Sequence, residues 1–335
     1  MTMIFSGMKK LLSILLLGAL SMLFAEVFSG SSTLWFLDPW GLLVAFPLYL
    51  GHAIFLLNLA FLLKKTSPRQ LYFFGMLFGL YEALITKVLW FGYPASTGPM
   101  VSSFFGIAWG EFLTLVLFWH PVMSFLIPVF VYEMVSGDVL PGHERFVQKN
   151  WKTILLVIIL IVMGASFQSN GAKYDVIRSV GSLGGSILIV VLLHFLTKGK
   201  NLPTLVLGKK AMMVVVVYLF VLYGTTTAFI FPERLPKMIL PYVLIFLWYL
   251  VTIGLLWVDR FRPVSVPLRG MPFSQKDLGF FALLVVSATV VCSLVSQITY
   301  AVLLAMFVTL MGAGIVLFFV CLFSLVKQRI SIVQA

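Results

Sequence analysis

Long apolar runs separated by short polar segments dominate the chain. A helix that crosses a bilayer needs about 20 mainly apolar residues, and it satisfies its own backbone hydrogen bonds within the lipid. We therefore predict an all-α, polytopic transmembrane helical bundle of about 10 spans. The predicted spans are roughly Leu11–Phe28, Trp40–Leu63, Leu71–Trp90, Phe104–Val135, Trp151–Phe167, Gly181–Leu196, Ala211–Phe231, Met238–Trp257, Leu278–Val295 and Ala301–Val326.

The fourth run, Phe104–Val135, is too long for one perpendicular span, and His120-Pro121 interrupts it. It predicts either a hairpin of two short helices or one kinked crossing. Basic residues decide between them, because lysine and arginine accumulate in short cytoplasmic loops. One net crossing puts the basic residues on the cytoplasmic side, together with both termini. The exceptions among the 23 are Lys87, inside a span, and Lys173, Arg178, Arg234 and Lys237, on the other side.

The composition agrees with a membrane protein: 61% of residues are hydrophobic, 10% are charged, and the mean hydropathy is +1.10. A soluble chain carries about 25% charged residues, so a disordered chain, a nucleic-acid-binding domain and a disulfide-stapled scaffold are excluded. The net charge of +12 is interpreted as an orientation signal beside anionic headgroups on the cytoplasmic side. Cys292 and Cys321 lie in apolar runs, which argues against a redox or metal role for them.

Ionisable side chains within the spans are concentrated in the first 135 residues, whereas the last five spans contain only His194. Such residues are costly in a membrane and mark candidate functional sites. We therefore expect a single integral membrane domain, 1–335, with a polar, functional half (1–135) and a mostly apolar scaffold half (136–335). From the orientation, any site in the first half opens toward the extracytoplasmic side.

The third span carries the clearest pattern. Gly75, Gly79, Glu82 and Thr86 fall on one stripe of an α-helix. The glycine pair is a small-xxx-small motif that allows another helix to approach closely. Glu82 is therefore expected to face a protein interface rather than lipid.

The fourth span has its own glycine pair, Gly106 and Gly110, directly before Glu111. We expect the two spans to pack together and to bring Glu82 near Glu111. Two neighbouring buried carboxylates would share a proton or bind a cation. The alternative is that each glutamate is protonated and hydrogen-bonds a neighbouring helix.

His120 is the third candidate. It lies about 180° around an unbroken helix from Glu111, so the two can share a site only if the helix deforms. Pro121 provides a reason for such a deformation, and Ser124 shares a face with His120. Alternatively, His120 bonds a carbonyl that the kink frees.

The remaining ionisable residues have simpler expectations. Lys87 is expected to reach the outer headgroups, with Glu26 or Asp38 as alternative partners. His52 is interpreted as a packing histidine, and Glu133 as a solvated residue near the inner interface.

Two segments carry a family resemblance. Phe78–Lys87, with Glu82, and His120–Ser124 resemble the CPBP family of intramembrane metalloproteases, which has a Glu-Glu-x-x-x-Arg helix and a His-x-x-x-Asn motif. Tyr81 stands in place of the first glutamate and Ser124 in place of the asparagine. The resemblance implies a metal-dependent hydrolase to which Glu82 and His120 carry over. The same segments are similar to those of uncharacterised prokaryotic polytopic membrane proteins.

Three functions remain open. The candidate site of Glu82, Glu111 and His120 would serve a proton- or cation-coupled transporter. It would alternatively hold a metal in a membrane-embedded hydrolase acting on a lipid or peptide. In the third case the polar residues only lock helices together, in a non-catalytic subunit or assembly factor. No phosphate loop, dinucleotide fingerprint or haem motif identifies a cofactor.

Overall fold

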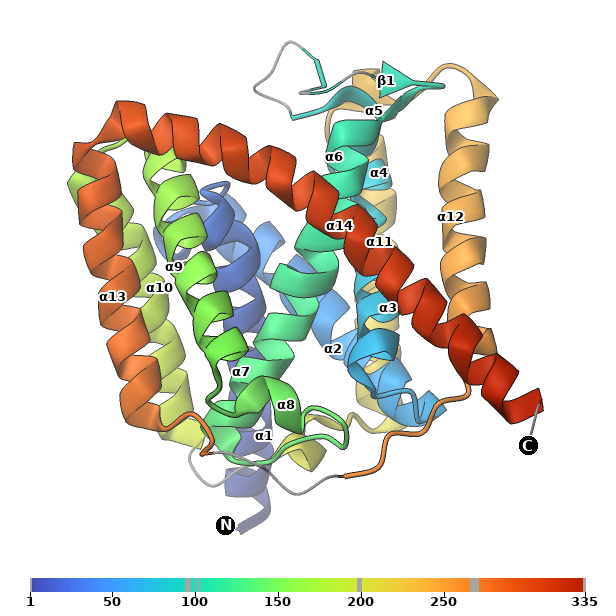
Figure 1. The fold of residues 1–335 in the computed structure, drawn as a ribbon, viewed down its shortest axis with the longest axis horizontal. Coiled ribbons are helices and arrows are strands. Elements are labelled where there is room, and N and C mark those ends of the chain that lie inside the picture. The colour runs from blue at the N-terminus through green and yellow to red at the C-terminus, as the bar shows by residue number, and fades with distance from the viewer. Residues whose placement is uncertain are drawn as a thin grey trace.

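The computed structural model describes residues 2–93, 98–99, 101, 103–197, 201–265 and 271–333, and it is a helical bundle (Figure 1). Within these residues, nine helices are long and apolar enough to cross a membrane, which confirms the predicted all-α class. Eight of them contain the long helices α1 (Thr2–Met22), α2 (Phe46–Leu63), α9 (Trp151–Gly171), α10 (Val176–Thr197), α11 (Lys209–Phe229), α12 (Ile239–Val258), α13 (Gln275–Leu294) and α14 (Ser296–Val333).

Short helices lie in the connections and at helix ends: η1 (Leu23–Val27), η2 (Trp35–Leu37), η3 (Gly41–Ala45), α8 (Glu144–Val147), η5 (Leu202–Leu205) and η6 (Pro232–Arg234). Several helices begin where the sequence provides a cap. The side chains of Ser67, Asn150 and Ser274 each accept hydrogen bonds from the first turn of the helix that follows. In return, the backbone N–H of each donates to the side chain three residues further on. This reciprocal arrangement satisfies backbone donors that a helix start leaves unpaired.

The third pass is interrupted, in contrast to the predicted continuous helix over Leu71–Trp90. It consists of α3 (Pro68–Gly79), α4 (Tyr81–Leu84) and α5 (Val88–Phe91). Lys87, just before α5, has a left-handed backbone with φ of 62°. Its side chain is completely buried and donates to the carbonyl oxygens of Thr226 and Ile230, at the end of α11. The expectation that Lys87 reaches the outer headgroups is therefore wrong.

The fourth pass is one continuous crossing, as the distribution of basic residues predicts. It runs through α6 (Trp109–Thr114), η4 (Leu115–Leu126) and α7 (Ile127–Ser136), and η4, which contains Pro121, is a π-helix. The helix begins five residues later than predicted, because β1 (Ser103–Phe104) and β2 (Ile107–Ala108) form an antiparallel hairpin. Phe105 and Gly106 both have positive φ, as the tight two-residue turn of a hairpin requires.

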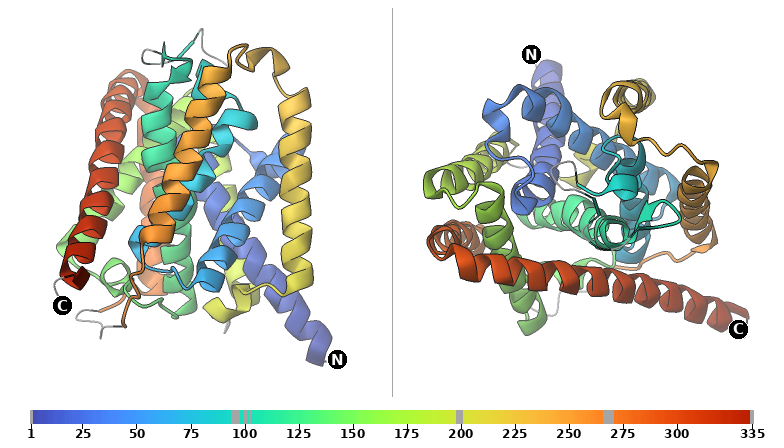
Figure 2. Two further views of the ribbon diagram at one scale, coloured as in Figure 1. Left: turned by 90° about the vertical axis from the view of Figure 1, so that its right-hand side faces the viewer. Right: turned by 90° about the horizontal axis from the view of Figure 1, so that it is seen from above.

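The early passes form the centre of the bundle. In an 18-residue apolar stretch of each span, Gly7–Val27, Gly41–Leu63 and Trp109–Ser136 bury 61%, 56% and 78% of the residues, whereas each of the six later spans buries 33% or less. The later helices flank this centre, and α14 runs diagonally across one side of it (Figures 1 and 2). Their exposed Leu, Val, Ile and Phe side chains suit contact with lipid.

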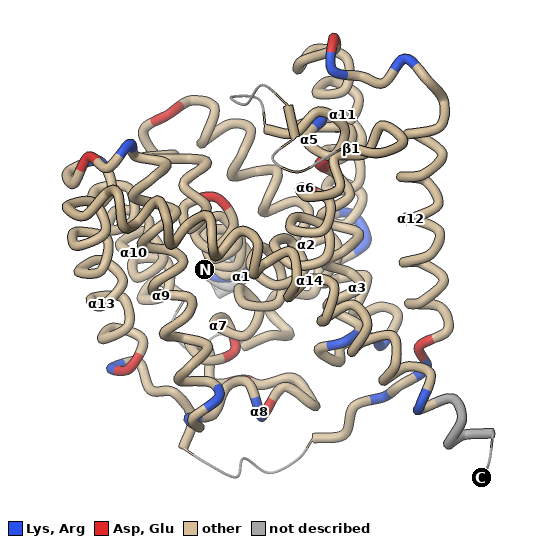
Figure 3. The backbone as a smooth tube through the Cα atoms, turned by 45° about the horizontal axis from the view of Figure 1, so that its top comes forward, with Lys and Arg blue, Asp and Glu red and all other residues tan. Residues whose placement is uncertain are grey.

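The start of α1 and the end of α14 lie at the same end of the bundle (Figure 1). Basic residues are numerous there (Figure 3), and we call it the basic end. Arg69 forms a bidentate ion pair with Asp259, at 2.7 and 2.9 Å, and Lys149 pairs with Asp277 at 2.7 Å. Three basic residues that the sequence assigns to this end, Lys198, Lys200 and Arg269, lie outside the described residues.

Candidate functional site

The glycines of α3 allow the third and fourth passes to touch at their backbones. A Cβ atom on Gly75 would lie 2.4 Å from Cα of Pro121, and one on Gly79 would lie 3.0 Å from Cα of Val116. Both distances are shorter than a normal carbon–carbon contact. The predicted close approach at this glycine pair is confirmed. The next helix, α4, begins two residues after Gly79 and carries Glu82.

Glu82 and His120 meet at this crossing. The Glu82 Oε1 atom and His120 Nε2 are joined by a 2.9 Å hydrogen bond, and His120 Nδ1 is 2.9 Å from the Ser124 hydroxyl. Thr86 donates to the second carboxylate oxygen of Glu82. Glu82 is 7% exposed and His120 is 1% exposed. The structure therefore brings together two of the three predicted residues, and it confirms the shared face of His120 and Ser124.

A second hydrogen-bonded group lies against this pair. The Tyr49 hydroxyl donates to Glu26 at 2.6 Å and lies 2.9 Å from the Tyr81 hydroxyl. Ser32 donates to the other oxygen of Glu26, also at 2.6 Å. The Tyr81 ring packs edge-on against His120 with centroids 5.0 Å apart. Two carboxylates, those of Glu26 and Glu82, are thus each held by polar partners within the bundle.

Both carboxylates line one cavity of about 1140 Å³. Its rim is formed by the connection after η1, including Asp38, and by the connection after α11, including Glu233, with Arg178 at the start of α10. These connections lie at the end of the bundle opposite the basic end (Figures 1 and 2). The cavity therefore leads from that end down to Glu26 and Glu82, and we call it the acidic cavity.

Tyr93, which follows α5, is a further lining residue of the acidic cavity. Burial raises the pKa of the Tyr93 hydroxyl well above its usual range, and the negative charges of Glu82, Glu111 and Glu26 raise it further. Tyr93 therefore stays protonated and can act as a hydrogen-bond donor beside the carboxylates.

Glu111 does not join the pair. Among the described residues, the hydrogen bonds of the Glu82 carboxylate go to His120 and Thr86. Glu111 is fully buried on α6 and is not among the lining residues of the acidic cavity. The reason lies in its glycines: Gly106 is in the hairpin turn against Pro241, and Gly110 packs on Val101 rather than on α3.

The described residues contain no group of three or more His, Cys, Asp or Glu side chains arranged to hold a metal ion. Glu82 and His120 supply one oxygen and one nitrogen donor, whereas protein zinc sites use at least three protein ligands. The Glu82–His120 pair alone therefore supplies fewer donors than a zinc site uses.

Sequence reasoning missed a second buried glutamate–histidine pair. Glu133 is completely buried rather than solvated, and it accepts a 2.7 Å hydrogen bond from His143 near the basic end. His143 also contacts the carbonyl oxygen of Thr66 at 2.8 Å. His143 lies in a polar connection, so only its ten-residue spacing from Glu133 could have suggested the pair. His52, by contrast, is the packing histidine that the sequence predicts: it contacts the Leu48 carbonyl at 2.8 Å and stacks on Phe78.

The fold and the buried site together define a multi-pass integral membrane protein. The chain belongs to an uncharacterized membrane protein family, whose model matches residues 15–334. It is also 42% identical over 154 residues to an uncharacterized protein of Archaeoglobus fulgidus, an alignment that covers 44% of this chain and 48% of that protein. No solved structure matches the chain significantly.

The family match agrees with the similarity to uncharacterised prokaryotic polytopic membrane proteins, and the matched family is not the CPBP family. The resemblance of Phe78–Lys87 and His120–Ser124 to the CPBP motifs therefore stays local. The description of the matched family assigns no activity.

Proposed function

We propose that the protein is a proton-coupled transporter of the cell membrane. In this proposal the Glu82–His120 pair binds the coupling proton, and the acidic cavity receives the solute. One observation carries it: Glu82 is hydrogen-bonded to an imidazole on one side and lines a cavity of about 1140 Å³. Buried carboxylates and histidines that face a cavity are typical of proton relays in pumps and transporters.

The interrupted helices on both sides of the pair support this proposal. Transporter sites are commonly built where transmembrane helices are discontinuous, because unwound segments expose backbone groups and permit movement. Here the third pass breaks around α4, which carries Glu82, and the fourth pass becomes a π-helix at His120. π-helical segments often occur at functional sites.

The orientation follows from charge. Basic loops face the cytoplasm, so the basic end and both termini are assigned to the cytoplasmic side, next to anionic headgroups. The acidic cavity then opens to the extracytoplasmic side. In this proposal residues 1–135 supply the carboxylates and the histidine, whereas 136–335 supply cavity walls and packing.

Proton exchange at Glu82 can be tested without knowing the solute. Infrared difference spectra of the purified protein in lipid, recorded between acidic and neutral pH, report the protonated carboxyl groups. We expect a carboxyl band in the wild type that is absent from Glu82→Gln. The matched control is Glu133→Gln, which removes a buried carboxylate paired with a histidine but placed outside the acidic cavity.

Transport itself is tested in proteoliposomes that contain a pH-sensitive dye, with a panel of small cations, amino acids and sugars added outside. We expect at least one solute to drive acidification of the lumen in the wild type and in Glu133→Gln, but not in Glu82→Gln. If Glu82→Gln changes only thermal stability and its carboxyl spectrum equals that of the wild type, the proposal is wrong. The polar residues would then serve helix packing, as in a subunit or assembly factor.

A further inference from the structure

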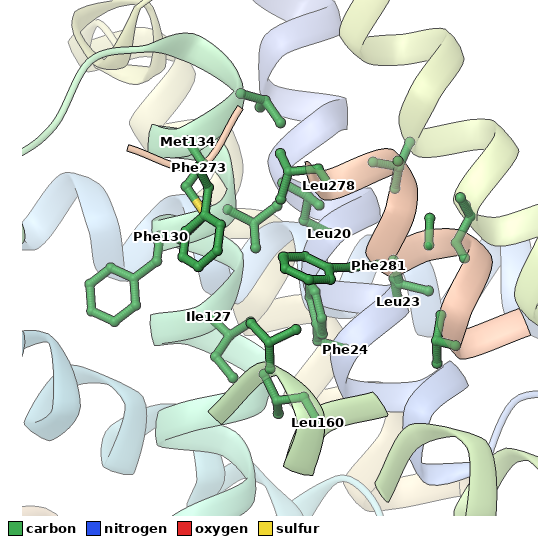
Figure 4. Close-up of a pocket in the computed structure, with 18 of the residues that line it drawn as sticks. Leu20, Leu23, Phe24, Ile127, Phe130, Met134, Leu160, Phe273, Leu278 and Phe281 are labelled. Carbon is green, nitrogen blue, oxygen red and sulfur yellow. The ribbon is translucent and has the colours of Figure 1, made fainter. Parts of the chain in front are cut away.

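A second cavity in the bundle is almost entirely apolar. It has a volume of about 410 Å³ and lies between α1, α7, α9, α10 and α13. In Figure 4 the hydrocarbon side chains of Leu20, Phe24 and Phe281, from α1, η1 and α13, lie beside one another at this cavity. This apolar cavity has a size typical of ligand sites, and its lining suits a hydrocarbon chain.

A pocket of about 860 Å³ adjoins the apolar cavity at the basic end, and the two share Phe146, Thr153 and Leu156 as lining residues. Arg145 and Lys152 line this loop pocket, together with the buried Glu144. Both basic side chains are exposed, and neither forms an ion pair with an acid within the described part of the chain.

The loop pocket also contains a buried hydrogen-bond acceptor that lacks a donor. The Oε1 atom of Gln148, another lining residue, is buried and has no hydrogen-bond partner within the described residues. A buried acceptor without a donor is costly. A ligand hydroxyl in the pocket would satisfy it, while the two basic residues would neutralise a phosphate.

We propose that the apolar cavity and the loop pocket together bind one anionic membrane lipid from the cytoplasmic leaflet. One hydrocarbon chain enters the apolar cavity. The phosphate contacts Arg145 and Lys152, and a headgroup hydroxyl donates to Gln148. The two cavities follow one another as the hydrocarbon chain and the headgroup do in a lipid. Phe146 and Thr153 line both, at the place where the apolar cavity meets the loop pocket.

The proposed phosphate contact with Arg145 and Lys152 is tested by native mass spectrometry of the full-length protein in detergent. Phosphatidylglycerol and phosphatidylcholine with identical acyl chains are added in equal amounts. We expect the wild type to retain phosphatidylglycerol preferentially, and Arg145→Gln/Lys152→Gln to lose that preference by roughly tenfold or more. The matched control is Lys209→Gln/Lys210→Gln, which removes two exposed lysines at the same end outside both cavities and should behave as the wild type.

The proposed binding of a hydrocarbon chain is tested by filling the apolar cavity with a larger side chain. Gly279 lines this cavity, and no atom lies within 4 Å of the position of its missing Cβ, so Gly279→Leu should fold and lower binding of both lipids severalfold. Gly254→Leu is the control, because Gly254 has equal free space but does not line the cavity. Equal retention of the two lipids by the wild type would overturn the proposal. So would an equal loss in the Lys209/Lys210 control, or wild-type binding in Gly279→Leu.

Discussion

The contact between α3 and η4 places the Glu82–His120 pair, and Gly75→Ala tests that contact directly. The new Cβ would lie 2.4 Å from Cα and 3.0 Å from the carbonyl oxygen of Pro121. Carbon atoms in contact are normally about 3.5–4.0 Å apart, so an overlap of about 1 Å must be relieved. The Pro121 atoms concerned belong to the backbone of a π-helix. The overlap therefore cannot be relieved by rotating a side chain.

The magnitude follows from two opposing effects. Overpacking of this kind costs about 1–3 kcal/mol, and a backbone clash belongs to the upper part of that range. Alanine in place of glycine within a helix returns about 1 kcal/mol. We therefore expect Gly75→Ala to lower the free energy of unfolding by about 1–2 kcal/mol. Gly79→Ala should lower it less, because its closest backbone atom is 3.0 Å away.

The assay is thermal unfolding of the purified protein in detergent, followed by tryptophan fluorescence. One kcal/mol corresponds to about 2–4 °C in a chain of moderate size, so Gly75→Ala should melt several degrees below the wild type. Gly312→Ala is the matched control: no atom lies within 4 Å of its missing Cβ, so it should melt at or above the wild-type temperature. If Gly75→Ala also melts at or above that temperature, the two helices do not touch at Gly75.

Three further outcomes are expected. Lys87 is completely buried, so an amine-acylating reagent should leave it unmodified while exposed lysines react, as measured by peptide mass spectrometry. If Lys87 in the folded protein were acylated as fast as the exposed lysines, its buried position would be contradicted. Arg69→Met should lower the free energy of unfolding by about 3–5 kcal/mol in chemical or thermal unfolding, because it leaves the fully buried Asp259 side chain without its cation. Lys149→Met should cost less than about 1 kcal/mol, because the side chains of Lys149 and Asp277 are 37% and 26% exposed; equal losses in the two variants would refute the reasoning.

The fold was largely predictable from the sequence because hydropathy reports the physics of a membrane directly. A run of apolar residues must be helical in lipid, and basic residues indicate which loops share a side. The exception is the third pass, which is apolar enough to resemble one helix yet breaks at α4 and α5. Apolar composition cannot reveal such a break, because partners from α11 stabilise it.

The candidate site was predictable only where the signal was local. Glycine spacing on one helix face indicated the contact that carries Glu82, and Pro121 indicated the deformation at His120. Contacts between residues far apart in sequence left no such trace. Lys87 bonds a carbonyl 139 residues away, and Tyr49 joins Glu26 to Tyr81 from a third helix. Those partners become visible only once the helices are packed.

The length of α14 has a mechanical consequence. Its 38 residues extend about 57 Å, almost twice the roughly 30 Å of a bilayer core, so the helix lies steeply inclined (Figure 1). It starts next to α13 and passes α9 and η4, and near its far end Ser324 and Gln328 are anchored by Arg69. α14 therefore connects the α9–α10–α13 group to the α3–α12 group. A rocking movement of one group against the other would have to move α14 as well, or break its hydrogen bonds to Arg69.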